Sequence, residues 1–128
     1  MIYTVTLNPA IDKTVVIENF RAGSVNRVAS VREDAGGKGI NVSKCLKNLG
    51  AESVAAMILA GKAGDQLEAM LRSLEIPVLQ VRAEGQSRTN LKIIDPAKKE
   101  NTDINEPGPT VSAELLEELK GKLSERIQ

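Results

Sequence analysis

Short apolar blocks alternate with polar stretches along the chain, and several of these blocks predict β-strands. The β-rich run Ile2–Leu7 and the apolar run Val54–Leu59 both read as buried strands. A third short strand is expected at Val78–Val81, after a proline. Thr14–Ile17 and Val25–Arg32 are further strand candidates in the first quarter of the chain.

Two helical patterns lie between the buried strands, and a third one closes the sequence. In the first two, apolar residues recur at i, i+3, i+4 and i+7: Val42, Cys45, Leu46 and Leu49, and then Leu67, Met70, Leu71 and Leu74. The first stripe predicts that Cys45 is a core residue and not a nucleophile. The last helix opens with Thr110 or Ser112 as its N-cap. Strands and helices that alternate with short connections predict a parallel sheet covered by helices.

The segment between Ser87 and Asn105 has a different pattern. Polar and apolar residues alternate from Ser87 to Ile94, a turn-rich stretch follows, and Asn101–Asn105 reads as a returning strand. We expect an antiparallel hairpin here. The final helix is followed by no strand, whereas an α/β layer normally continues to one. The expected fold is therefore an α/β fold that reads as unfinished, a parallel sheet with covering helices plus a small antiparallel part.

Length and composition restrict the function classes. A chain of 128 residues is the size of one domain, spanning 1–128, and 17 basic residues balance 17 acidic ones. Without a global positive field we expect no nucleic-acid partner. The N-terminus lacks a leader pattern and no apolar run is long enough to cross a membrane, so we expect a cytoplasmic protein without a membrane partner. The sequence contains no histidine and one cysteine, which excludes Ser-His-Asp and Cys-His catalysis and predicts no metal site.

The glycine cluster before the first helix is the best candidate for ligand binding. Gly36 and Gly37 allow close approach to a helix N-terminus, Lys38 adds a positive charge, and Asn41 adds an amide in the first turn. These groups suit sugar hydroxyls or a phosphate. A tight strand-to-helix turn is an equally good interpretation. The spacing matches neither the phosphate loop of P-loop enzymes nor a dinucleotide-binding fingerprint.

Other candidates lie outside the glycine cluster. Asp12 follows the first strand, where open α/β sheets bind ligands, and its carboxylate could hold two sugar hydroxyls; a turn-capping role is the alternative. Arg88, Asn90 and Lys92 share one strand face and could bind a phosphate. A solvated strand face is the competing interpretation.

Four ordered segments resemble the N-terminal part of the PfkB (ribokinase-like) carbohydrate kinases. They are Met1–Asp12, Asp34–Gly50, Ser87–Lys92 and Thr102–Pro109. The 1-phosphofructokinase branch looks nearest, followed by tagatose-6-phosphate kinase. One departure is Ala60, where the family signature expects glycine.

This resemblance implies ATP-dependent phosphorylation of a ketose phosphate, fructose 1-phosphate to fructose 1,6-bisphosphate. The matching positions Asp12, Gly36, Gly37 and Asn41 would hold the sugar, Lys38 and Arg88 would lie near its phosphate, and Asn90 and Lys92 resemble the fructose 1-phosphate branch. Four strands, at about 13–18, 25–33, 87–94 and 101–106, would form a β-sheet lid that closes over the sugar phosphate and commonly pairs two subunits as a homodimer.

Family members are more than twice this length, and the resemblance places the catalytic base and the ATP site in the part that is absent. We therefore expect no catalytic residue here, and ATP and Mg²⁺ are implied only for the full-length family. Ala63-Gly64-Asp65 lies too early in the sequence to be the family's catalytic motif. The 128-residue chain alone should be inactive, and a separately encoded C-terminal part is a candidate partner. A non-catalytic fragment that binds a sugar phosphate or dimerises through the lid is the alternative, as is a segment of a tagatose-6-phosphate kinase.

Overall fold

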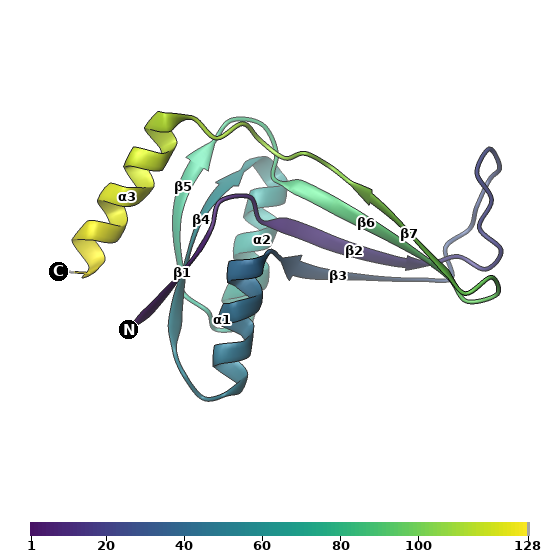
Figure 1. The fold of residues 1–128 in the computed structure, drawn as a ribbon, viewed down its shortest axis with the longest axis horizontal. Helices are drawn as coiled ribbons and strands as arrows, with labels where there is room; N and C mark the ends of the chain where they lie inside the picture. Colours follow the sequence, from purple (N-terminus) through teal and green to yellow (C-terminus); the bar gives the residue numbers. More distant parts are fainter. Residues whose placement is uncertain (128) are drawn as a thin grey trace.

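A computed structural model describes residues 1–127 and shows two β-sheets joined side by side (Figure 1). The first sheet is parallel and has the order β1-β4-β5, formed by β1 (Ile2–Thr6), β4 (Ser53–Ala60) and β5 (Val78–Ala83). The second sheet has the order β3-β2-β6-β7, formed by β2 (Ala10–Val16), β3 (Ser30–Gly36), β6 (Arg88–Asp95) and β7 (Glu100–Asn105). The helices are α1 (Lys38–Asn48), α2 (Gly61–Ser73) and α3 (Ala113–Ile127). We call the three-stranded sheet with its helices the body and the four-stranded sheet the lid.

The body has three layers, because β4 is buried on both faces. Its alternate side chains Ala55, Met57 and Leu59 belong to a core shared with α1 and α2. Ala56 and Ile58 point to the opposite face and pack with Leu119 of α3. Two helices therefore cover one face of the sheet and α3 covers the other, as Figure 1 shows. The predicted α/β fold with a parallel sheet is confirmed.

The lid extends away from the body as a twisted sheet (Figure 1). Its β6–β7 pair is the antiparallel hairpin that the alternation predicted. The β2–β3 pair is also antiparallel, whereas β2 and β6 are parallel because the chain crosses the whole body between them. The tip is held by the buried carboxylate of Asp95, which accepts hydrogen bonds from the backbone N–H groups of Asn19 (3.0 Å), Phe20 (2.8 Å) and Ala97 (3.1 Å).

Two predicted lid strands are displaced along the sequence. The strand expected at 25–33 runs from Ser30 to Gly36, and the one expected at 13–18 runs from Ala10 to Val16. The side chain of Asn26 explains the first difference. Its amide accepts from the backbone N–H of Arg21 (2.9 Å) and donates to the Arg21 carbonyl (2.8 Å), which folds this stretch into a loop.

The predicted core stripe of α1 is wrong. Val42 is 50% exposed and Leu49 is 78% exposed, and Cys45 is an exposed free thiol. The buried face carries Ile40 and Ser43 instead. Ser43 is buried because its hydroxyl lies 2.7 Å from that of Thr4 and accepts from that of Ser53 at 2.9 Å, so hydrogen bonds satisfy this polar group against the sheet.

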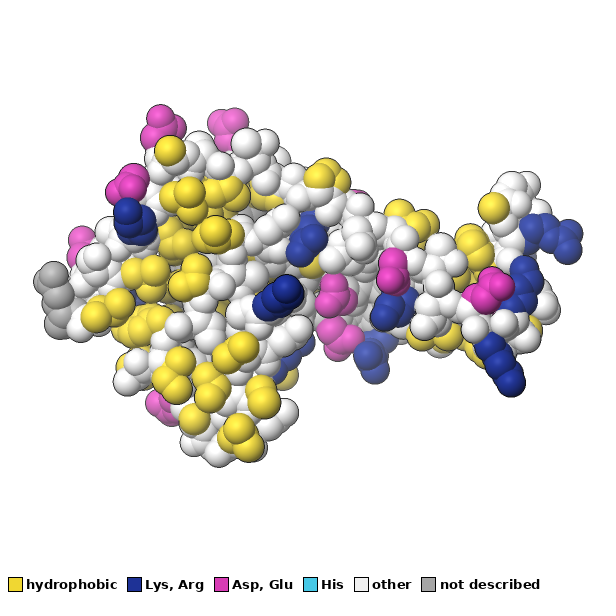
Figure 2. All heavy atoms as spheres, viewed as in Figure 1, with side chains coloured by type: hydrophobic (Ala, Val, Ile, Leu, Met, Phe, Trp, Pro, Cys, Tyr) yellow, Lys and Arg dark blue, Asp and Glu magenta, His cyan; other side chains and the backbone are white. Residues whose placement is uncertain are grey.

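The last helix begins as predicted, with the Ser112 hydroxyl accepting a hydrogen bond from the backbone N–H of Leu115 at 3.2 Å. Apolar atoms gather over the body, whereas charged side chains are prominent along the lid (Figure 2). Among residues 1–127, no helix has the length and apolar composition needed to cross a bilayer.

Candidate functional site

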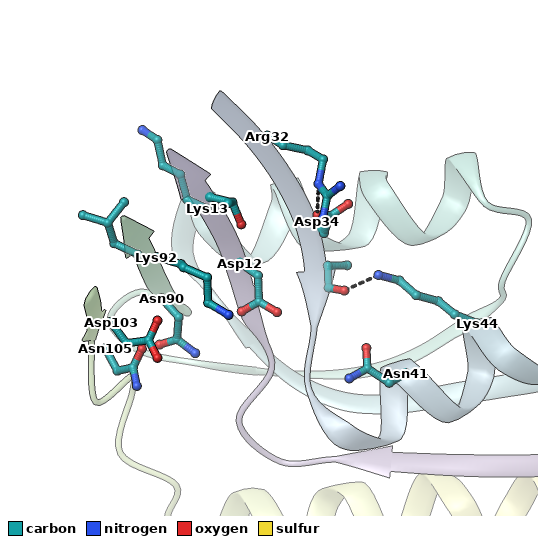
Figure 3. A pocket seen from close by; sticks show the side chains of 13 residues that line it. Asp12, Lys13, Arg32, Asp34, Asn41, Lys44, Asn90, Lys92, Asp103 and Asn105 are labelled. Atoms are coloured by element: carbon teal, nitrogen blue, oxygen red, sulfur yellow. Dashed lines mark hydrogen bonds and ion pairs between the residues drawn. The ribbon is translucent and has the colours of Figure 1, made fainter. Parts of the chain in front are cut away.

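A cavity of about 460 Å³ lies between the inner face of the lid and the N-terminal half of α1. This volume is in the range of small-molecule sites. Nearly all of its lining side chains are polar or charged, and Figure 3 shows them converging from β2, β3, β6, β7 and α1. The lining residues are Asp12, Lys13, Thr14, Arg32, Asp34, Ala35, Asn41, Lys44, Asn90, Leu91, Lys92, Asp103 and Asn105.

The strand register explains why polar side chains meet on this face. Two rows of residues cross the four strands, in the order β3, β2, β6, β7: Asp34, Asp12, Asn90 and Asn105, and then Arg32, Thr14, Lys92 and Asp103. Residues two apart on a strand share a face, so both rows point into the cavity. The opposite face carries apolar residues such as Val15 and Ile93. The alternation seen in the sequence thus separates a polar inner face from an apolar outer face.

Asp12 is positioned by a glycine on the neighbouring strand. Gly36 is the last residue of β3, it is paired with Ala10, and the Asp12 carboxylate lies over it. A Cβ atom built on Gly36 would be 2.5 Å from Asp12 Cγ, so only glycine leaves room for the carboxylate in this orientation. Asp12 lies within β2, which overturns the turn-capping alternative.

The start of α1 forms the other wall of the cavity. Gly37 precedes the helix with φ 127°, a conformation that favours glycine, and no side chain caps the helix N-terminus. Asn41 is exposed toward the cavity, and Lys44 donates a hydrogen bond from Nζ to the Ala35 carbonyl. Backbone N–H groups at such a helix end favour an anionic or hydroxyl-rich ligand.

Positive charge in the cavity is only partly neutralised. Arg32 Nε lies 2.8 Å from Asp34 Oδ2 in an exposed ion pair. Among residues 1–127, neither Lys44 nor Lys92 is within ion-pair distance of a carboxylate. Lys92 extends across the lid toward Asp12 in Figure 3. These two ammonium groups leave the cavity suited to a ligand with both hydroxyls and a negative charge.

One buried polar atom in the cavity lacks a partner. Asn90 Oδ1 is inaccessible to solvent and makes no hydrogen bond within the described part of the chain. Buried amide oxygens are almost always satisfied in folded proteins. The amide of Asn90 is therefore a group that a ligand hydroxyl would complete.

The structure brings some of the predicted site residues together and leaves others outside. Asp12, Asn41, Asn90 and Lys92 line the cavity, and Gly36 supports Asp12. Gly37 and Lys38 lie at the start of α1 without lining the cavity, and the Lys38 side chain is exposed. Arg88 is also outside the lining, and its Nε donates to the Asn8 carbonyl at 3.1 Å.

Sequence reasoning missed several lining residues. The expected bounds of β2 and β3 were displaced, so their register did not point to Thr14, Arg32 and Asp34. The pairing of β6 with β7 was not followed residue by residue, so it did not point to Asp103 and Asn105. The alternation of β7 could have indicated the last two. Lys44 gave no local signal, since a lysine on a helix is usually solvated.

The described residues contain no preformed cluster of metal ligands. No three Asp, Glu or Cys side chains lie together within residues 1–127 as metal ligands require.

Comparison with known proteins identifies the fold family. Residues 5–128 match the pfkB family carbohydrate kinases. The chain belongs to this family. A 1-phosphofructokinase of Xanthomonas campestris is 48% identical over 106 residues, which cover 82% of this chain and 33% of that enzyme. A tagatose-6-phosphate kinase of Staphylococcus epidermidis is 33% identical over 123 residues, covering 96% of this chain and 39% of that enzyme.

Solved PfkB structures agree with this assignment. Phosphofructokinase-2 of Escherichia coli in complex with fructose-6-phosphate superposes with a TM-score of 0.88 at 27% identity, covering 97% of this chain and 41% of the E. coli chain. The chain therefore spans 33% to 41% of the length of these relatives. Membership of this sugar-kinase family implies ATP as the cosubstrate and Mg²⁺ as the metal of the full-length proteins.

Proposed function

We propose that this chain is the sugar-binding side and lid of a ketose-phosphate kinase, of the type that converts fructose 1-phosphate to fructose 1,6-bisphosphate with ATP. The observation that carries the proposal is the polar face of the lid. It presents Asp12 and the unsatisfied Asn90 amide in one row, with Lys92 in the next. A carboxylate, an amide and an ammonium group are the complement of a sugar that bears a phosphate.

In this arrangement the chain binds and orients the acceptor sugar. Asp12 accepts hydrogen bonds from two adjacent hydroxyls, and Asn41 and Asn90 hydrogen-bond further sugar oxygens. Lys92 and Lys44 attract the existing phosphate, with Arg88 as a further candidate at the base of the lid. Holding the hydroxyl for attack on the γ-phosphate of ATP supplies positioning, a large part of catalysis in phosphoryl transfer.

The catalytic base, the ATP contacts and the groups that stabilise the transferred phosphoryl group are proposed to lie outside this chain. The sequence contains no histidine. Of the three carboxylates that line the cavity, Asp12 is proposed to bind sugar hydroxyls, Asp34 is paired with Arg32, and Asp103 lies on β7 in the same row as Lys92. The chain by itself is proposed to bind the sugar phosphate weakly and to transfer no phosphate.

The outer face of the lid supports a second part of the proposal, a homodimer formed through the lid. An apolar hollow of about 440 Å³ lies on this face, between Val15, Val28, Val31 and Ile93. Val28 is 50% exposed and Val31 is 56% exposed. A second lid packed there would remove these side chains from water.

The alternatives are a tagatose-6-phosphate kinase segment and a non-catalytic fragment that binds a sugar phosphate or only dimerises. A chimera separates them: residues 1–128 are joined to the C-terminal part of the Xanthomonas campestris 1-phosphofructokinase that follows the matched segment. We expect ATP-dependent turnover with fructose 1-phosphate and a lower kcat/KM with tagatose 6-phosphate.

A matched pair of variants controls the experiment. Asp12→Asn keeps the size of the side chain and removes the charge that accepts from sugar hydroxyls, so KM for the sugar phosphate should rise. Asp65→Asn, on the exposed start of α2 and outside the cavity, should leave kinetics unchanged. A folded chimera that phosphorylates no ketose phosphate would refute the proposed function.

A further inference from the structure

Four stretches of chain connect the lid with the body (Figure 1). They are residues 7–9 between β1 and β2, residue 37 between β3 and α1, residues 84–87 between β5 and β6, and residues 106–112 between β7 and α3. The cavity has one wall on each part, because its polar rows belong to the lid, whereas Asn41 and Lys44 belong to α1. The contacts among these four connections therefore help to set the distance between the two walls.

The first connection contacts the chain at each of the other three crossings. The side chain of Asn8 donates from Nδ2 to the Pro107 carbonyl at 3.0 Å, and the Asn8 carbonyl accepts from Nε of Arg88, the first residue of β6, at 3.1 Å. Pro9 is fully buried, and its Cα lies 3.6 Å from a Cβ atom built on Gly37. Residues 8 and 9 thus form the junction at which the four connections meet.

The bond from Asn8 to Pro107 holds the last connection. Within residues 1–127, no other hydrogen bond joins residues 106–112 to a segment outside the lid and α3. The Asn8 amide packs directly on Gly108, where φ is 81° and a Cβ atom would collide with Asn8 Oδ1. Glycine at this position therefore lets the amide reach the Pro107 carbonyl.

One polar atom of Asn8 lacks a partner. Asn8 Oδ1 is buried and accepts no hydrogen bond within the described residues. A buried amide oxygen without a partner destabilises a fold, and such violations are expected mainly where a residue serves function. Asn8 itself does not line the cavity. Its contribution to the sugar site must therefore pass through the backbone.

The place of Asn8 gives it leverage over the polar rows of the lid. Asp12 follows Asn8 by four residues on the same stretch of extended chain. Since four extended residues span about 13 Å, a lid rotation of about 5° at Asn8 would move Asp12 by about 1 Å. A displacement of this size is enough to break a hydrogen bond to a sugar hydroxyl, and reaction rates respond steeply to it.

We propose that Asn8 is a positioning residue, which fixes the lid over the start of α1 and thereby sets where Asp12 and Arg88 meet the sugar phosphate. The inference rests on the proposed function of the cavity. Arg88 shares the inner face of the lid with Asn90, and its Nε is oriented by the Asn8 carbonyl. Among the described residues, the rest of its guanidinium group makes no hydrogen bond or ion pair, so it stays available to a phosphate.

Distances between the lid and the body test this role without measuring activity. In a Cys45→Ser background, spin labels are attached to Ala97→Cys at the lid tip and to Glu52→Cys in the body, both exposed positions. The labelled chain is diluted with unlabelled chain, so that pulsed EPR records distances within one molecule. Because the eight residues of β6 span about 26 Å, a lid rotation of about 5–10° moves the tip by roughly 2–5 Å. Asn8→Ala should shift or broaden the distance distribution by this amount.

Two further variants separate positioning from a loss of stability. Asn8→Asp keeps the size of the side chain and removes the Nδ2 donor, so it should change the distribution as Asn8→Ala does, and it carries the test if the alanine variant does not fold. Ser112→Ala is the matched control, because it removes a hydrogen bond from the same connection, that from the Leu115 N–H, without touching Asn8. It should lower the melting temperature and leave the distances unchanged.

Kinetics of the chimera described above give a second readout. Asn8→Ala and Asn8→Asp should lower kcat/KM for the sugar phosphate on the order of tenfold or more and leave KM for ATP unchanged. Ser112→Ala should change neither quantity. A chimera without turnover would count against the proposed function alone, because the distances are measured in the 128-residue chain itself.

Three results would contradict the positioning role. The first is an unchanged distance distribution in both Asn8 variants. The second is a change of equal size in Ser112→Ala, since the lid would then respond to any loss of stability. The third is weaker sugar-phosphate kinetics with unchanged distances, which would mean that Asn8 contacts the ligand directly.

Discussion

Replacing Gly36 by alanine separates the role of Asp12 in binding from the stability of the fold. The new Cβ would lie 2.5 Å from Asp12 Cγ and 2.9 Å from Oδ1. Carbon atoms in contact prefer about 3.5–4.0 Å, so the carboxylate must move by about 1 Å. Its side chain can do so by rotating away from its preferred orientation, which costs on the order of 0.5–1.5 kcal/mol.

This cost to folding is largely offset. A glycine within a strand loses more conformational freedom on folding than alanine does, and the substitution recovers about 0.5–1 kcal/mol of this. The free energy of unfolding should therefore change by less than about 1 kcal/mol. Binding should change more, because a hydrogen bond stretched by about 1 Å is lost. Loss of one hydrogen bond to a charged group costs about 1.5–3 kcal/mol, a rise in KM of roughly 10- to 150-fold.

The assay combines thermal unfolding of the 128-residue chain with steady-state kinetics of the chimera. Gly36→Ala should raise KM for the sugar phosphate and leave KM for ATP unchanged. Gly39→Ala should instead destabilise the fold and lower the melting temperature. Its Cβ would lie 2.7 Å from the Val5 carbonyl oxygen, a backbone atom that cannot rotate away. Gly121→Ala, with no atom near its Cβ, is the neutral or stabilising control. Unchanged sugar kinetics in Gly36→Ala would show that Asp12 does not contact the substrate.

Three further predictions follow from the lid and the cavity. The pure 128-residue chain should release no ADP in a coupled assay with ATP and fructose 1-phosphate, and measurable turnover would contradict the placement of the catalytic base elsewhere. In the chimera, Lys92→Ala should raise KM for the sugar phosphate about tenfold or more with KM for ATP unchanged, whereas Arg88→Ala should also lower the melting temperature because the bond to the Asn8 carbonyl is lost. Burial alone would raise the pKa of Asp95, but hydrogen bonds from the backbone N–H groups of Lys98, Phe20 and Asn19, and the Lys98 charge, lower it overall. The ionised Asp95 carboxylate therefore stabilises the fold above the pKa of an unfolded Asp, and this stabilisation is lost as the pH falls through the lower pKa of the folded state. Between pH 7 and pH 2, the melting temperature should fall less steeply in Asp95→Asn than in the unsubstituted chain.

Strand and helix order could be read from the sequence because local patterns determine it. The continuous apolar run of β4 predicted a strand covered on both faces, and β4 is buried throughout. The alternation around Arg88–Lys92 predicted one polar face, and that face lines the cavity at Asn90 and Lys92. The hydrophobic period and the composition of a segment do not depend on its neighbours in space, so they can be read from the sequence alone.

What only the tertiary structure decided were the contacts between distant segments. The apolar stripe of α1 has the correct helical spacing, yet the helix packs with Ser43 against the sheet, where the hydroxyls of Thr4 and Ser53 hydrogen-bond it. Val42 and Leu49 are therefore exposed to solvent. The lid register brings Asp12 opposite Asn90, 78 positions along the chain, and no local pattern encodes that pairing. A strand pairing depends on which surfaces meet after folding, and a one-residue shift would have turned every one of these polar side chains to the apolar face.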